Sequence, residues 1–241
     1  MTITLLIGGA RSGKSALAVA RALDWQRNDV CRTGLQAQAR LSGEVPVGRG
    51  EGGPDDAHFF GDRSVVFVAT GSGGDDEMAD RIGRHKAERP ASWETVEAPL
   101  DLVAGLRVAS CLSLPGSPRG ICEPGEPALI IDCLSMWVAN HLMPSMSSSS
   151  SVASSPSMPL LDQATAEAEL HRQIQECFVY LRSRAAPTWF VTNEVGMGLV
   201  PMNILGRHYR DVLGRVNAAV SLLADEAFLT VAGRIVRLDR P

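Results

Sequence analysis

The sequence lacks a long hydrophobic run, an excess of positive charge and any cysteine spacing typical of a metal site. Its longest apolar runs, Ile3 to Ile7 and Ala128 to Ile131, are far shorter than the roughly 20 residues that span a bilayer. We therefore expect no membrane segment. The chain has 23 Lys and Arg and 27 Asp and Glu, so its net charge is −4. No overall positive charge favours binding to nucleic acid.

The five cysteines and the first residues both favour a cytoplasmic protein. The cysteines are odd in number and show no C-x-x-C or Cys/His ligand spacing, so we expect reduced thiols. The first residues, Met1 to Ile3, lead into an apolar run without a basic segment or a small-residue cleavage site. No secretory signal is therefore expected.

The length of 241 residues suits one large α/β domain over residues 1–241. Two segments differ in composition from the rest and are predicted to be flexible inserts. Residues 31–63 are rich in Gly, Arg and Asp, and residues 144–161 contain the serine run Ser147 to Ser151 between prolines. Such compositions do not bury a core.

Outside the inserts, predicted strands alternate with predicted helices. The strands are expected at residues 3–7, 65–70, 93–96, 128–131 and 188–192, and the helices at 14–23, 75–86, 100–109, 134–142, 163–184 and 203–223. Residues 227–231 and 234–238 are expected to form a closing hairpin around Gly233. The alternation predicts an α/β fold with a mostly parallel sheet, helices on both faces and a C-terminal antiparallel hairpin.

The loop after the first strand matches the phosphate-binding pattern G-x-x-x-x-G-K-[ST] with Gly8, Gly9, Ala10, Arg11, Ser12, Gly13, Lys14 and Ser15. Its glycines allow successive backbone N–H groups to point at phosphate oxygens. Lys14 offers a charge to the β- and γ-phosphates, and Ser15 offers a hydroxyl to Mg²⁺. The following helix directs its N-terminus at the anion. The pattern predicts an ATP or GTP site in an α/β fold of the P-loop NTPase kind.

Such a site needs an acid to hold Mg²⁺ or its waters. Asp132 follows the apolar strand at 128–131, which is the place for this acid, although a terminal Asp is also a common N-cap for a helix such as 134–142. Glu97, which follows the predicted strand at 93–96, is included among the expected nucleotide-binding residues.

A histidine in a basic segment is the candidate nucleophile. Arg81, Arg84 and Lys86 surround His85, which suits an approaching polyphosphate and favours a neutral imidazole. A neutral imidazole is a competent nucleophile toward phosphorus. The alternative is a half-buried histidine that packs beside Met78 with no chemical role.

A second candidate region follows the strand at 188–192, at the carboxyl end where α/β sheets bind ligands. Glu194 lies in the string Thr192 to Gly198 and could act as a base or orient water near Mg²⁺; the alternative is a plain connecting loop. Arg207 and His208 are further candidates for substrate contact, although His208 could equally cap a packed helix.

Together these motifs resemble one family, the bifunctional adenosylcobinamide kinase/adenosylcobinamide-phosphate guanylyltransferases of cobalamin biosynthesis. The resemblance rests on the phosphate loop, on Val68-Ala69-Thr70, Asp76-Glu77-Met78, Arg81-Ile82, His85-Lys86, Arg89-Pro90 and Trp93, on Thr192-Asn193-Glu194-Val195-Gly196-Met197-Gly198 with Val200-Pro201 and Arg207, and on Arg210-Asp211 with Gly214-Arg215-Val216-Asn217. It covers nearly the whole chain outside the inserts.

The resemblance implies two reactions. A nucleoside triphosphate, ATP or GTP, phosphorylates adenosylcobinamide, and GTP then gives its GMP unit to adenosylcobinamide phosphate through a guanylylated histidine, which corresponds to His85. It also implies that Gly13, Lys14, Ser15 and Asp132 serve the nucleotide site, and that the protein is a homotrimer. This sequence departs from some members in having Arg84, not histidine, before the nucleophile, and in its two inserts.

Two other functions fit part of the pattern. One is a simple P-loop kinase for a small molecule, which would not carry a nucleotidyl group on His85. The other is a nucleotide-sensing module in which the phosphate loop acts as a switch. Labelling with GTP that is radioactive at the α-phosphate distinguishes the first, and product formation with adenosylcobinamide distinguishes the second.

Overall fold

The computed structural model describes residues 2–27, 63–71, 83, 89–112, 126–142 and 160–240, without the side chains of 160–163. The predicted helix at 75–86 lies outside these residues except for Gly83, which is helical. Most of the predicted insert at 31–63 and residues 144–159 of the second insert also lie outside the described chain.

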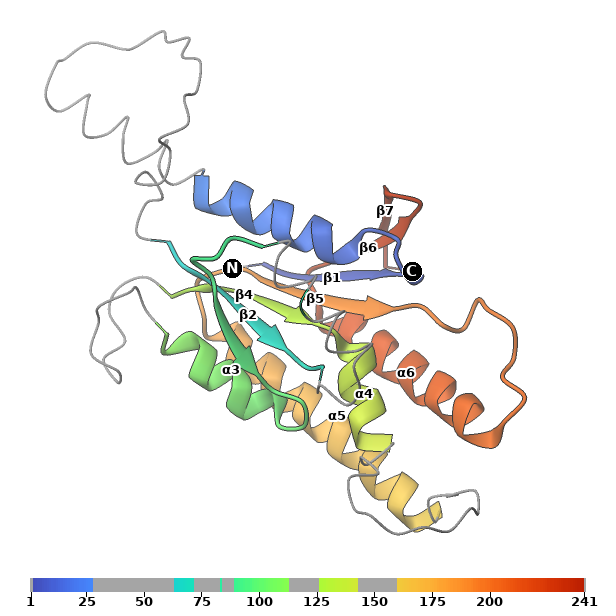
Figure 1. Ribbon diagram of the computed structural model, residues 1–241. Coiled ribbons are helices and arrows are strands. Elements are labelled where there is room, and N and C mark those ends of the chain that lie inside the picture. The colour runs from blue at the N-terminus through green and yellow to red at the C-terminus, as the bar shows by residue number, and fades with distance from the viewer. Residues whose placement is uncertain are drawn as a thin grey trace, which may run out of the picture.

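The described residues form a seven-stranded sheet in the order β3-β2-β4-β5-β1-β6-β7 (Figure 1). All neighbouring strands are parallel except β6 and β7, which form the predicted C-terminal antiparallel hairpin. The strands are β1 (Ile3–Gly8), β2 (Val65–Ala69), β3 (Glu94–Glu97), β4 (Ala128–Asp132), β5 (Thr188–Asn193), β6 (Glu226–Val231) and β7 (Arg234–Leu238). The predicted α/β class with a mostly parallel sheet is confirmed.

Helices cover both faces of this sheet, as the sequence predicts. Among the described residues, the helix over residues 14–27 packs on one face, and four helices cover the other (Figure 1). The four are α3 (Leu102–Ser110), α4 (Leu134–Leu142), α5 (Leu160–Arg182) and α6 (Ile204–Leu223).

The two faces bury separate cores because side chains alternate along each strand. Leu6, Ile130 and Trp189 pack with Ala18 and Ala22 of the helix at 14–27. Their sequence neighbours pack under the four-helix layer, where the core includes Leu5, Ile131, Phe190, Leu106, Trp137, Leu181 and Val216. Strands buried on both faces explain the continuous apolar runs in the sequence.

Several helix boundaries differ from the predictions. The first helix continues past the predicted end at residue 23 to at least residue 27, where Gln26 anchors it by donating to Arg63 O and accepting from Trp93 Nε1. The helix predicted at 100–109 starts at Leu102, where the Asp101 carboxylate accepts from Ala104 N as an N-cap. The helix α5 starts at Leu160, so the last two residues of the predicted insert at 144–161 are helical.

Among the described residues, no helix has both the length and the apolar character needed to cross a membrane.

Two glycines in helix interiors give opposite predictions for stability. A Cβ on Gly105 of α3 would lie 2.4 Å from Ala98 Cβ, whereas one on Gly214 of α6 would meet no described atom within 4 Å. We expect Gly105→Ala to lower the free energy of unfolding by about 1–3 kcal/mol through overpacking. Gly214→Ala should raise it by roughly 0.5–1 kcal/mol, since alanine has the higher helix propensity. Equilibrium urea denaturation measures both; a Gly105→Ala protein as stable as the wild type would contradict the close packing of α3 on the sheet.

Candidate nucleotide site

The phosphate loop follows β1 directly and turns into the helix at 14–27. Arg11 and Gly13 have positive φ angles of 56° and 98°, which turn the backbone tightly before the helix begins. A Cβ on Gly8 would lie 2.3 Å from Thr230 O, so only glycine fits where β1 ends. Gly9, Ala10, Arg11 and Gly13 are exposed, which leaves the outer side of the loop open to a ligand.

The ammonium group of Lys14 is held at the mouth of this loop. Its Nζ donates to Gly8 O at 3.0 Å, to Gly9 O at 2.6 Å and to Ser12 Oγ at 3.4 Å. Lys14 is 6% exposed, so its charge is placed by the loop itself rather than by flexible solvent contacts. A cation beside backbone N–H groups at a helix N-terminus forms an anion-binding arrangement.

The C-terminal hairpin braces the loop from one side. Thr230 Oγ1 donates to Ile7 O at 3.1 Å and lies 3.3 Å from Ser12 Oγ. Gly233 N donates to Ser12 O at 3.2 Å. Residues near the end of the chain therefore fix the middle of a loop near its beginning.

The segment after β5 braces the loop from the other side. Glu194 N donates to Gly8 O at 2.9 Å. Asn217 of α6 holds the end of β5, since it accepts from Thr192 Oγ1 at 2.7 Å and donates to Asn193 O at 3.0 Å. Glu194 is thus positioned beside the phosphate loop, as its place after the strand predicts.

The two predicted acids lie on one face of the sheet. In the register of β4, β2 and β3, Asp132 pairs with Ala69, and Ala69 pairs with Glu97. Paired residues of neighbouring strands share a face, and two strand spacings separate the backbones of the acids by roughly 10 Å. Asp132 also pairs with Val191, whose side chain packs toward the helix at 14–27. The acids therefore face the side of the sheet on which Ser15 begins that helix.

A guanidinium group accompanies Asp132 on this face. Arg89 lies 4.0 Å above the Phe67 ring. Burial lowers the pKa of Arg89 from its usual value, while the nearby charge of Asp132 opposes this change. The positive charge on Arg89 and the carboxylate of Asp132 therefore influence each other at the carboxyl edge.

The residue after Asp132 is fixed by Thr70. Thr70 Oγ1 donates to Cys133 O at 2.7 Å and accepts from Cys133 N at 2.8 Å, and Thr70 N donates to Asp132 O at 3.2 Å. Burial, followed by the charge of Asp132, raises the pKa of the Cys133 thiol to about 11. This thiol is therefore protonated near neutral pH, and Cys133 is a structural neighbour of the acid.

The three candidates for substrate contact separate in space. The Glu194 carboxylate accepts from Gly196 N within its own turn. Arg207 Nη1 donates to Pro201 O and Met202 O, so Arg207 holds the loop before α6. His208 Nε2 lies 3.7 Å from Glu167 Oε1 of α5, on the helical layer. Glu194 alone of the three is bonded to the phosphate loop in the described structure.

His85, the predicted nucleophile, lies outside the described residues. The chain is described again from Arg89, on which the charge of Asp132 acts. The residues that are described contain no group of three His, Cys, Asp or Glu side chains suited to a metal. Mg²⁺ in nucleotide sites commonly uses one or two protein ligands with phosphates and waters, and Ser15 and Asp132 suit that coordination.

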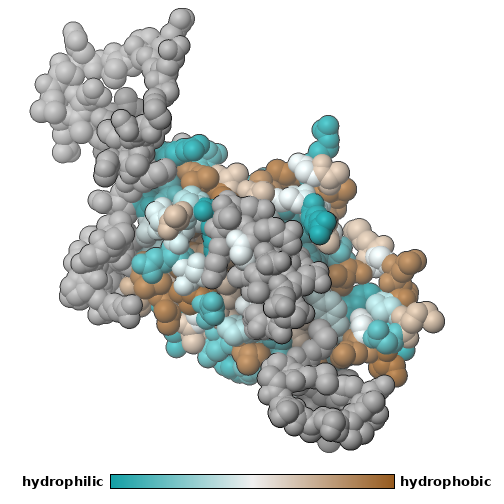
Figure 2. Space-filling model, viewed as in Figure 1, coloured by the Kyte–Doolittle hydropathy of each residue, from teal (hydrophilic) through white to brown (hydrophobic). Residues whose placement is uncertain are grey.

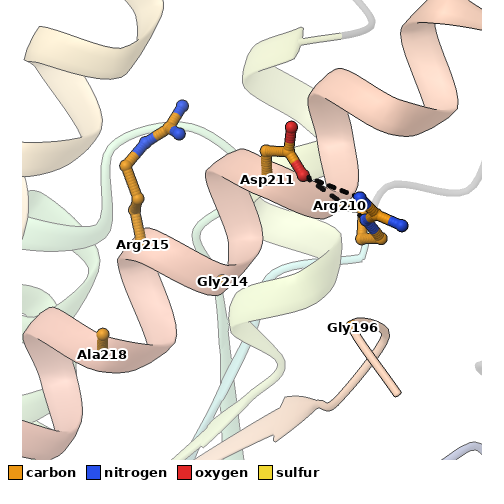
Figure 3. A pocket seen from close by; sticks show the side chains of 6 residues that line it. All are labelled: Gly196, Arg210, Asp211, Gly214, Arg215 and Ala218. Atoms are coloured by element: carbon orange, nitrogen blue, oxygen red, sulfur yellow. Dashed lines mark hydrogen bonds and ion pairs between the residues drawn. The ribbon is translucent and has the colours of Figure 1, made fainter. Parts of the chain in front are cut away.

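A solvent-open pocket of about 530 Å³ lies beside the turn that follows β5 (Figure 3). It is lined by Gly196, Arg210, Asp211, Gly214, Arg215 and Ala218. Arg210 pairs with Asp211 at 3.3 Å, and Arg215 extends to Glu167 of α5 at 2.7 Å. These contacts make the pocket a polar surface of α6 next to the candidate site.

Three residues that brace the site have no role that the sequence alone predicts: Thr70, Asn217 and Thr230. Thr70 and Asn217 lie in strings that carry the family resemblance, but their hydrogen bonds depend on the fold. Thr230 gives no local signal, since its partners Ile7 and Ser12 lie more than 200 residues away in the chain.

The fold and the loop define a class. A mostly parallel sheet in which an interior strand ends in a braced G-x-x-x-x-G-K-S loop is that of a P-loop nucleotide-binding enzyme.

Comparison with known proteins gives the family. The profile of the family "Cobinamide kinase / cobinamide phosphate guanyltransferase" matches residues 57–238. The Salmonella typhimurium bifunctional adenosylcobalamin biosynthesis protein CobU is 31% identical over 97% of this chain and 98% of its own. The Pseudomonas aeruginosa protein CobP is 30% identical over 95% and 92%, and Escherichia coli CobU is 32% identical over 75% and 89%. The chain belongs to the cobinamide kinase/cobinamide phosphate guanyltransferase family and is an enzyme of that class.

The brace from the hairpin can be tested at one hydroxyl. We expect Thr230→Val to lower the free energy of unfolding by about 1–2 kcal/mol and to weaken nucleotide binding, because both contacts of the hydroxyl are lost. Thr230→Ser keeps the hydroxyl and should retain most of the affinity. Titration with a fluorescent GTP analogue and urea denaturation measure the two effects. Full nucleotide affinity in Thr230→Val would show that the loop does not depend on this brace.

Proposed function

We propose that residues 8–15 bind the triphosphate of ATP or GTP, and that the enzyme phosphorylates adenosylcobinamide and then transfers GMP from GTP to adenosylcobinamide phosphate. The observation that carries this proposal is the braced loop at the end of β1, with the Lys14 ammonium fixed at its mouth. Membership of the family supports the two reaction types.

In the kinase step, the loop amides and Lys14 bind the phosphates and stabilise the charge that develops as the γ-phosphoryl group leaves. The attacking oxygen is the hydroxyl of adenosylcobinamide. Mg²⁺, when bound with the nucleotide, would neutralise phosphate charge, and Ser15 and Asp132 would hold it. The register supports this role for Asp132, because its side chain faces the helix at 14–27 while α4 packs on the opposite face.

In the transferase step, we assign the nucleophile to His85. Its imidazole nitrogen attacks the α-phosphorus of GTP, the bond to the β-phosphate oxygen breaks, and pyrophosphate leaves. An oxygen of cobinamide phosphate then attacks the same phosphorus and the P–N bond breaks, which frees the imidazole and forms adenosyl-GDP-cobinamide. Glu97 and Asp132 serve the nucleotide in this proposal, and Glu194, Arg207 and His208 serve the substrate. Assembly as a homotrimer and location in the cytoplasm stay predictions.

Removal of the loop cation tests the kinase step. We expect Lys14→Ala to lower the kinase kcat by about a hundredfold or more, because a preorganised positive charge is lost where negative charge develops. Arg172→Gln, which removes an exposed cation of α5, is the control and should leave kcat unchanged. A thermal melt checks that both variants are folded. Near-normal phosphorylation of cobinamide by folded Lys14→Ala would remove Lys14 from the mechanism.

The covalent step is tested with GTP labelled at the α-phosphate. The wild-type enzyme should retain an acid-labile, base-stable label and release pyrophosphate, as a phosphorus–nitrogen bond requires. His85→Ala should retain no label, whereas the control His171→Ala, at an exposed histidine of α5, should label normally. Persistent label in His85→Ala would exclude His85, and kinase activity without any label in the wild type would leave a simple kinase.

A further inference from the structure

The loop between β5 and α6 carries an unusual group of exposed apolar side chains. Within residues 197–204 five large side chains are mostly exposed: Met197 by 81%, Leu199 by 97%, Val200 by 61%, Met202 by 95% and Ile204 by 71%. We call these five residues the apolar segment. Figure 2 shows hydrophobic colour gathered at the right-hand margin, over this loop and the start of α6. A cluster of this kind marks a binding surface more often than scattered exposed residues do.

The backbone of the apolar segment is held in place, so its exposure is built into the fold. Arg207 Nη1 donates to Pro201 O at 3.1 Å and to Met202 O at 2.7 Å. The Asn203 side chain accepts from Gly206 N and caps α6. A Cβ on Gly206 would lie 2.8 Å from Pro201 Cβ, so the loop packs closely on the first turn of the helix. The polar backbone groups are bonded toward α6, and the apolar side chains remain outside.

The apolar segment begins next to the phosphate loop. Glu194 N is bonded to Gly8 O, and Met197 follows only three residues later. Because an extended chain spans at most about 3.6 Å per residue, Met197 lies within roughly 11 Å of Glu194. The segment therefore occupies the same edge of the sheet as the loop that faces the phosphates.

We propose that the apolar segment binds the corrin ring of cobinamide; this rests on the proposed function above. A nucleoside triphosphate is strongly anionic, so its phosphates would not bind to five exposed apolar side chains. The other substrate in the family description is cobinamide. Its corrin ring is a broad macrocycle with methyl-bearing faces, and the hydroxyl that accepts the phosphoryl group must reach the phosphate loop. Two methionines among the five suit an irregular apolar surface, because their side chains adapt their shape. Position and chemistry together select the corrinoid over a second copy of the chain.

The test uses the full-length enzyme and two double variants. Leu199→Gln with Met202→Gln replaces two nearly fully exposed residues, and so should not disturb the fold. Val179→Gln with Leu222→Gln is the matched control, since these side chains on α5 and α6 are 75% and 68% exposed away from the loop. Cobinamide binding is followed by equilibrium dialysis with detection of corrin absorbance. Binding of a fluorescent GTP analogue is measured in parallel.

We expect the loop variant to bind cobinamide about tenfold or more weakly, as the loss of two apolar contacts predicts, with unchanged affinity for the GTP analogue. The control variant should match the wild type in both. Wild-type affinity for cobinamide in the loop variant would overturn the proposal. A changed molecular mass of the loop variant in sedimentation would also overturn it, and would assign the segment to contacts between copies. The two proposals fail in different ways. If the wild-type enzyme neither bound nor phosphorylated cobinamide, the proposed function would fail. If the wild-type enzyme bound cobinamide and the loop variant bound it equally well, only the role of the apolar segment would fail.

Discussion

The carbonyl oxygen of Gly8 is the point on which the candidate site depends. It accepts from Glu194 N at 2.9 Å and from Lys14 Nζ at 3.0 Å, so the end of β1, the loop after β5 and the Lys14 ammonium meet at one atom. A side chain at Gly8 would collide with Thr230 O. The position of Lys14 therefore follows from the packing of three strands, not from the loop sequence alone.

The strand order explains how the acids reach the same site. Only β5 separates β4, which ends in Asp132, from β1, which ends in Gly8. Parallel strands bring their carboxyl ends to one edge, where ligands of α/β sheets bind. Alternation along the strand then puts Asp132 and Glu97 on the face of the helix at 14–27, whose first turn carries Ser15. The fold thus places a hydroxyl, a cation and the Asp132 carboxylate at one edge and on one face of the sheet, with Glu97 on the same face two strands beyond Asp132.

The features that the sequence predicted well, the strands and the phosphate loop, each depend on neighbouring residues in the chain. Strands buried on both faces produce continuous apolar runs, and the phosphate loop is a contiguous pattern with few alternatives. The hydrogen bonds that brace the loop could not be predicted from the sequence, because each joins residues far apart in the chain. Examples are Thr230 with Ser12 and Asn217 with Thr192. The sequence also contains no sign that Arg207 donates to loop carbonyls, since this contact depends on how residues 197–203 turn in space. The contact of Gln26 with Trp93, which anchors the first helix beyond residue 23, likewise joins distant residues.

Under the proposed function the site binds two substrates of opposite character, and only a few residues separate the two binding surfaces. The phosphate loop offers backbone N–H groups and a cation, which suit a polyanion. The apolar segment begins three residues after Glu194, and Glu194 is hydrogen-bonded to that loop. Arg207 and Asn203 anchor the far end of the segment to α6, and Asn217 of the same helix anchors the end of β5. Because one helix fixes both ends of this connection, the distance between the polar and apolar surfaces is set by packing before either substrate arrives.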